Sequence, residues 1–167
     1  MKMALFVIDV QNEFFDISPT TAQSLTDAIE YINAAIALFR EKELPVICVQ
    51  DVDEENGRLP NSTNFATPDT LHILPTDLHI HKKYGNAFNK TTLATDLQNM
   101  GVDTVIITGF SAEYCILSTY RGAEDVDLTP IILRGSLASA TPAHINFVET
   151  INNVLSYGVL EKLLSPS

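Results

Sequence analysis

Residues 104–124 read TVIITGFSAEYCILSTYRGAE, and this stretch joins an apolar run to a helical pattern. The run at 104–109 is apolar almost throughout, which is typical of a strand covered on both faces. Residues 113–124 have the pattern of a helix. A strand that leads through a short turn into a helix is the unit from which parallel sheets are built, so this stretch predicts an α/β fold.

The same alternation continues along the rest of the chain. Further apolar runs predict strands at residues 3–10, 45–50, 78–82 and 130–133, and helical patterns follow at 21–42, 91–100 and 143–155. The last helix is expected to begin with Thr141 as its N-cap and Pro142 in its first turn. We therefore predict a single three-layer α/β/α domain over residues 1–167, with a mostly parallel, Rossmann-like sheet of five or six strands.

Composition and charge narrow the function classes. A chain of 167 residues with 46% hydrophobic residues can bury one sizeable core without disulfides or metals to staple it. The formal net charge is −11, and no run is rich in lysine or arginine. Nucleic acids and anionic membrane surfaces attract clustered positive charge, so both are excluded as expected partners. The remaining class of expected partner is a small-molecule substrate.

The cysteines and the first apolar run bear on the compartment. Cys48 and Cys115 are too few for a disulfide framework, and Cys48 lies inside an apolar run, where we expect it to be core. The first run is interrupted at Asp9 and lacks a small-residue cleavage site, so it predicts a strand rather than an export signal. No apolar stretch approaches the length that spans a bilayer. These features predict a cytoplasmic protein with reduced thiols.

Three chemically capable side chains fall where ligands bind in parallel sheets, at or just beyond the carboxyl ends of predicted strands. Asp9 needs a cation, a donor or water there, or else it simply caps the next turn. Lys82 can stabilise a neighbouring thiolate or carboxylate, or is a solvated surface charge. Cys115 falls in the first turn of a helix, where free N–H groups and the dipole favour a thiolate, although inert packing is the alternative.

Three segments, in order along the chain, resemble the isochorismatase-like cysteine hydrolases, which include nicotinamidases and other small amidohydrolases. They are DVQN at 9–12, KKYGNAF at 82–88 and GFSAEYC at 109–115, with Thr119 one turn further on. The resemblance implies hydrolysis of a small-molecule amide or related C–N bond through a thioester, with Asp9, Lys82 and Cys115 as the catalytic triad. The resemblance assigns the catalytic lysine to Lys82 rather than Lys83, because the family's lysine lies six positions before the phenylalanine that Phe88 matches. A homo-oligomer is also implied.

The resemblance further implies a cis peptide between Phe110 and Ser111, and an oxyanion hole formed by the backbone N–H groups of Ser111 and Cys115. The long segment 51–76 has no sustained period and is typical of a loop that covers a site. Beyond Arg58 it offers no obvious charged binder, so a strongly anionic substrate has no evident clamp. The residues expected to shape a small, partly apolar pocket, each of which ordinary core packing could also explain, are Phe14, Phe15, Tyr84, Phe88 and Tyr114.

No cofactor or catalytic metal is expected. Nicotinamidases of this family hold a metal through an Asp and several His residues after the second strand, whereas here no histidine precedes His72 and Asp51 stands where a His is common. His79 and His81 share one strand face, and together with His72 and His144 they show no ligand spacing.

Two other functions stay open. One is hydrolysis of an isochorismate-like vinyl ether, against which Cys115 argues because relatives with that activity typically lack the cysteine. The other is a non-catalytic thiol-sensing or binding protein of the same fold, because a low-pKa thiol is also oxidisable.

Overall fold

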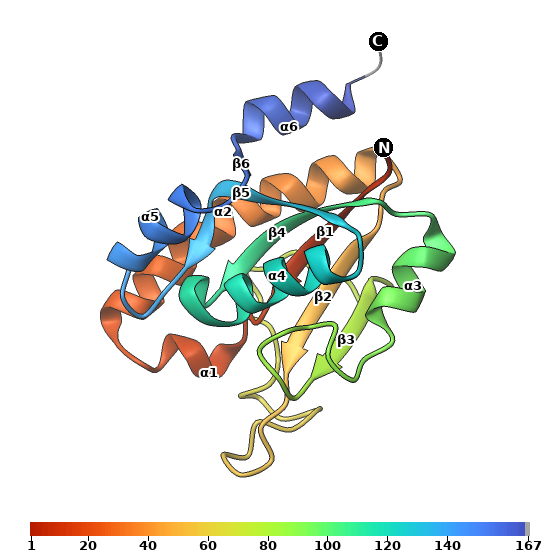
Figure 1. Ribbon diagram of the computed structural model, residues 1–167. Coiled ribbons are helices and arrows are strands. Elements are labelled where there is room, and N and C mark those ends of the chain that lie inside the picture. Colours follow the sequence, from red (N-terminus) through yellow and green to blue (C-terminus); the bar gives the residue numbers. More distant parts are fainter. Residues whose placement is uncertain (166–167) are drawn as a thin grey trace.

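A six-stranded sheet is the middle layer of the computed structural model, which describes residues 1–165 (Figure 1). The strand order is β3-β2-β1-β4-β5-β6, and every neighbouring pair is parallel. The predicted α/β fold is confirmed; of the predicted 1–167 domain, residues 166–167 lie outside the described part. The strands are β1 (Met3–Ile8), β2 (Val46–Asp51), β3 (Leu78–Lys82), β4 (Thr104–Phe110), β5 (Thr129–Ala138) and β6 (Val154–Leu155).

Helices cover both faces of this sheet (Figure 1). The apolar stripes of α2 (Pro19–Glu41) and α6 (Tyr157–Leu164) contribute to the core on one face. The core on the other face includes residues of α3 (Leu93–Met100), α4 (Leu117–Asp125) and α5 (Ala143–Thr150). Because β1 is buried on both sides, Leu5 belongs to the first core and Phe6 to the second, which explains its continuous apolar sequence.

Two short elements stand next to strand ends. A four-residue helix, α1 (Asn12–Phe15), follows β1, and a π-helical turn, η1 (Ala112–Ile116), joins β4 to α4. The helix expected at 113–124 is therefore divided into η1 and α4. From 52 to 76 the chain forms no helix or strand beyond an isolated bridge between Asp53 and Arg58, so the loop prediction is confirmed. No helix within residues 1–165 combines the length and apolar character needed to cross a membrane.

The C-terminal third departs from prediction. The helix expected at 143–155 ends at Thr150, because Val154–Leu155 pairs with β5 as an edge strand and α6 follows it. Periodicity alone does not separate so short an apolar strand from a helical segment. The strand expected at 130–133 continues to Ala138, past an irregularity opposite β4.

The start of α5 also differs. Pro142, not Thr141, is the N-cap of α5, and no side chain caps the helix. Thr141 is held instead through its backbone, since its N–H donates to Ser139 Oγ (2.9 Å).

Candidate active site

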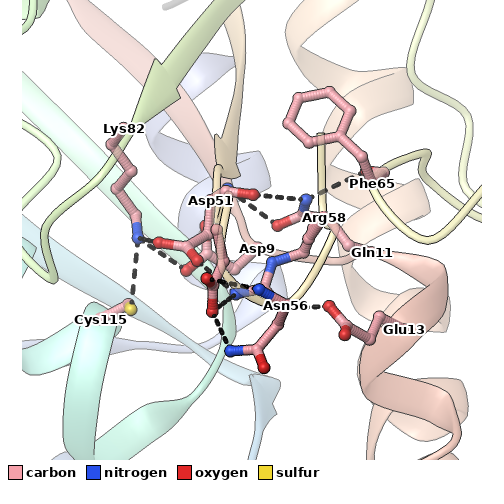
Figure 2. A network of polar contacts seen from close by, with 10 residues as sticks. Asp9, Gln11, Glu13, Asp51, Asn56, Arg58, Phe65, Lys82 and Cys115 are labelled. Carbon is pink, nitrogen blue, oxygen red and sulfur yellow. Dashed lines mark hydrogen bonds and ion pairs between the residues drawn. The ribbon is translucent and has the colours of Figure 1, made fainter. Parts of the chain in front are cut away.

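Asp9, Lys82 and Cys115 meet at the carboxyl ends of β1, β3 and β4 (Figure 2). Asp9 follows β1, Lys82 is the last residue of β3, and Cys115 lies on η1 directly after β4. Lys82 Nζ lies 2.9 Å from Asp9 Oδ2 and 3.3 Å from Cys115 Sγ. The Lys82 and Asp9 side chains are 0% and 2% exposed, so this ammonium and carboxylate neutralise each other away from water.

The backbone around Asp9 explains how the strand ends come so close. Asp9 leaves β1 with a φ of 53°, in the left-handed region that Asp adopts more readily than most residues. Gly109 of β4 has a φ of 118°, and a Cβ there would overlap the backbone of Ile8. Only glycine allows this approach, which sets Asp9 beside the turn that carries Cys115.

The turn from β4 into η1 is tightly organised. The Phe110–Ser111 peptide is cis, as the resemblance implied. The Ser111 carbonyl oxygen accepts hydrogen bonds from the backbone N–H groups of Tyr114 (3.0 Å) and Ile116 (3.2 Å). Ser111 and Cys115, whose N–H groups are the expected oxyanion donors, therefore belong to one short π-helical turn.

Burial and charge set the resting protonation state. Burial raises the pKa of Asp9 to about 6, although the Lys82 ammonium opposes the shift. Burial, reinforced by the charge of Asp9, raises the pKa of Cys115 to about 12. Burial alone lowers the pKa of Lys82, but the neighbouring acidic groups, Asp9 foremost, hold it above its ordinary value. At neutral pH the site holds a carboxylate, an ammonium and a neutral thiol.

The helix-start position of Cys115 favours a thiolate, but burial and the charge of Asp9 outweigh this effect and raise the pKa of the thiol. Lys82 already faces Asp9 and a further carboxylate, Asp51, whose Oδ1 lies 3.0 Å from Lys82 Nζ. A thiolate on Cys115 would be another anion sharing one ammonium in a buried site.

Arg58, from the loop after β2, extends the polar network (Figure 2). Its Nη2 donates to Asp51 Oδ2 at 2.6 Å, and its Nη1 donates to Glu13 of α1. The guanidinium carbon lies 4.8 Å from the centroid of the Phe14 ring. Gln11 ties the same region together, because its side chain accepts from the Asp51 N–H (2.8 Å) and donates to the Asp51 carbonyl (3.0 Å). Loop and strand ends thus form one hydrogen-bonded unit.

A cavity of about 430 Å³ opens onto these groups, a volume suited to a small molecule. Asp9, Cys115, Asp51 and Arg58 all line it. A second polar pair, Glu113 and His144, also lines the cavity. Ile17, Phe110 and Ala140 add apolar surface to its lining.

The structure places the five predicted pocket residues in different surroundings. Phe14 and Tyr114 line the cavity. Phe15 packs against the core under α2, and Phe88 packs against the core on the other face, so both lie outside the cavity. Tyr84 lies at the surface with 43% of its area exposed. The prediction is corrected for Phe15, Tyr84 and Phe88: their positions near the motifs in sequence did not aim them at the site.

The acidic groups at this edge do not fit a resident metal. Glu13, Asp51 and Asp53 converge on the Arg58 guanidinium, with Asp53 at 3.5 Å, so the local cation is already a side chain. Among residues 1–165 no three His, Cys, Asp or Glu side chains are grouped to hold a metal ion.

Comparison with known proteins identifies the family. The family model of the isochorismatase domain matches residues 3–154. The chain belongs to the isochorismatase family. It is 27% identical to the uncharacterized isochorismatase family protein YddQ of Bacillus subtilis, over 92% of this chain and 93% of that protein.

Other members of the isochorismatase family are similar along most of their length. The ureidoacrylate amidohydrolase RutB of Cronobacter sakazakii is 23% identical, over 84% of this chain and 76% of that protein. The crystal structure of an isochorismatase-like hydrolase from Alkaliphilus metalliredigens shares the fold, with a TM-score of 0.89 at 19% identity, covering 99% of this chain and 100% of that chain. The protein is thus an isochorismatase-family hydrolase.

Two cavity residues of this isochorismatase-family site were not predicted from the sequence. The sequence patterns show His144 as a histidine without metal-ligand spacing, and they place Glu113 within the GFSAEYC segment at the start of a predicted helix. Both follow carboxyl ends of strands, β5 and β4 respectively, which is the rule that singled out Asp9 and Lys82. Applied to β5, whose true end at Ala138 lies five residues later than predicted, the rule would have found His144.

Proposed function

We propose that the protein hydrolyses an amide or related C–N bond of a small molecule through a thioester on Cys115. The observation that carries the proposal is the position of the buried Lys82 ammonium, 2.9 Å from Asp9 Oδ2 and 3.3 Å from Cys115 Sγ. One cation there holds a base and a nucleophile together beside a cavity of substrate size. Membership of a family that contains amidohydrolases supports the same reaction.

In the first step Asp9 acts as the general base. Its Oδ2 faces Lys82, whereas its buried Oδ1 has no hydrogen-bond partner among residues 1–165 and is available for a proton. Because the pKa of the thiol is about 12 and that of Asp9 about 6, a free thiolate is scarcely populated beforehand. The proton therefore passes to Asp9 as Sγ attacks the carbonyl carbon.

The negative charge then appears on the former carbonyl oxygen, where the backbone N–H groups of Ser111 and Cys115 stabilise it. Asp9 gives its proton to the leaving nitrogen, the C–N bond breaks, and ammonia or an amine departs from a thioester on Cys115. Water, losing a proton to Asp9, attacks this thioester. The C–S bond breaks, the acid product leaves, and the proton on Asp9 restores the thiol.

The raised pKa of Cys115 weighs against the thiol-sensing alternative, which depends on a low-pKa thiolate. We further propose that the enzyme works in the cytoplasm, which suits its two free cysteines. A homo-oligomer is proposed as well, because Ile17 and Tyr114 leave 53% and 69% of their area exposed at the cavity, where a second copy could cover them. Light scattering on the purified protein tests the oligomer.

The reaction is tested by following ammonia release from a panel of small neutral amides. We expect Cys115→Ala to abolish release, and mass spectrometry of the wild-type protein quenched during turnover to show an acyl adduct on Cys115. Cys48→Ala is the matched control, since Cys48 is a buried core residue of β2 outside the cavity. Full ammonia release by Cys115→Ala would contradict the mechanism.

A further inference from the structure

The cavity has a second polar feature that the proposed reaction does not use. Glu113 and His144 both line the cavity, and His144 Nδ1 lies 2.8 Å from Glu113 Oε2. The two side chains differ in exposure: the Glu113 carboxylate is 17% exposed and the His144 ring 52%. A largely buried carboxylate thus holds an accessible imidazole at the cavity.

Glu113 is itself held from two directions. Ser111 Oγ donates to Oε1, and Ser139 Oγ donates to Oε2 at 2.7 Å. These bonds tie the turn after β4 to the end of β5. Although burial raises the pKa of Glu113, its hydrogen bonds from Ser111, Ser139 and His144 bring the pKa below the ordinary value. Glu113 is therefore a carboxylate, which can only accept hydrogen bonds.

The acceptor at Glu113 decides which nitrogen of His144 carries the proton. A neutral imidazole has one N–H, and the bond to Glu113 Oε2 places it on Nδ1. Nε2 is then left with a lone pair and accepts hydrogen bonds. In this neutral tautomer His144 presents an acceptor at a site distinct from Asp9 and Cys115.

Charge at the cavity limits the ligand further. Asp9, Asp51 and Glu113 line the cavity together with Arg58. The cations beside these carboxylates are already engaged, because Arg58 pairs with Asp51 and Lys82 pairs with Asp9 and Asp51. An anionic group would have to compete with these carboxylates for a cation. A neutral group with an N–H donor meets the acceptor it needs.

We infer that His144, positioned by Glu113, binds an N–H group of the substrate remote from the scissile carbonyl, so that the substrate class is neutral diamides. This inference rests on the proposed hydrolysis, because it assumes that the first amide is at Cys115. His144 is the substrate-contacting residue, and Glu113 is a positioning residue that acts through it.

The test compares succinamide with methyl succinamate, which differ in one end group: an amide with N–H donors against an ester without them. Ammonia release measures only amide cleavage, and kcat/KM is expressed per scissile amide. We expect the diamide to be favoured by about five- to tenfold, the worth of one hydrogen bond. Succinamate, which carries a carboxylate at the same end, is expected to be the poorest of the three.

Variants of His144 separate binding from structure. His144→Phe removes the acceptor, and His144→Asn replaces only the Nδ1 position; both should raise KM for succinamide about fivefold and erase the preference over the ester. His144→Gln, whose amide reaches the Nε2 position, should keep much of the preference. Glu113→Ala should lower the preference as well. His72→Phe, on an exposed histidine outside the cavity, is the matched control.

An unchanged preference in His144→Phe, or a wild-type enzyme that treats the diamide and the ester alike, would overturn the assignment. Absence of ammonia release from succinamide would overturn the substrate class. The proposed hydrolysis fails on a different result, namely release from any amide that persists in Cys115→Ala, so the two failures are distinguishable.

Discussion

Replacing Lys82 with methionine should destabilise the protein in a pH-dependent way. Lys82 Nζ is the buried cation between Asp9 Oδ2 at 2.9 Å and Asp51 Oδ1 at 3.0 Å. Methionine keeps most of the side-chain volume but leaves Asp9, which is 2% exposed, without its counter-charge. Removing one partner of a buried pair costs about 3–5 kcal/mol in free energy of unfolding. We expect a loss of this size at pH 8.

At pH 5 the loss should be smaller, about 1–2 kcal/mol, which is the worth of the remaining hydrogen bonds. The pKa of Asp9 is already raised to about 6, and it rises further without the Lys82 charge. A carboxyl whose pKa is raised by folding contributes stability that is present at low pH and lost as the pH rises through that pKa. At pH 5 Asp9 is protonated, so the loss of Lys82 leaves no unpaired charge on it.

Urea denaturation at pH 5 and pH 8 measures both values. Lys83→Met is the matched control, because Lys83 is the next residue, pairs with Glu54 and is 62% exposed, so it should change stability little at either pH. The double variant Asp9→Asn/Lys82→Met should recover much of the pH 8 loss, since it removes both charges of the buried pair. A Lys82→Met loss that is equal at the two pH values, or no larger than that of Lys83→Met, would refute this reasoning.

Three further perturbations test the site and its frame. The kcat/KM for a cleaved amide should fall as the pH drops below about 6, because the base Asp9 becomes protonated there, and a pH–rate profile measures this. Arg58→Met should lower the free energy of unfolding by about 2–3 kcal/mol through loss of its pairs with Glu13 and Asp51, and Arg58→Lys should have an intermediate stability. Urea denaturation measures both variants, and the same stability in the wild type and the two variants would contradict the role of the guanidinium. Gly109→Ala should lower the free energy of unfolding by about 4 kcal/mol or more, or prevent folding, because its Cβ would overlap the backbone of a neighbouring strand. Gly57→Ala, with open space around its Cβ, should lower it by about 1 kcal/mol, and thermal melts compare the two variants.

The sequence allowed most of the sheet to be predicted, because β1, β2 and β4 are short apolar runs that a helical pattern precedes or follows. Residues 104–109 and 78–82 coincide closely with β4 and β3. The edge strand β6 escaped, since two apolar residues, Val154 and Leu155, carry no period of their own. The contacts of Phe15, Phe88 and Tyr84 escaped for a related reason: an aromatic side chain fits a core and a pocket equally well, and only the packed fold decides between them.

The meeting of Asp9, Lys82 and Cys115 follows from topology, because β1 lies between β2 and β4, and β3 flanks β2. Their protonation does not follow from it, because it depends on burial and on Asp51, a residue that sequence reasoning considered only as a lost metal ligand. With Asp9 and Asp51 beside Lys82, a standing thiolate would be a third acidic group around this buried ammonium, and of the three only Asp51 is also paired with Arg58. In the proposed reaction the proton stays on Cys115 until a carbonyl is present, and the new charge then forms on the substrate oxygen, where the backbone N–H groups of the turn after β4 stabilise it. The proposal therefore ties reactivity at Cys115 to the presence of substrate, which the helix-start position of the thiol alone would not require.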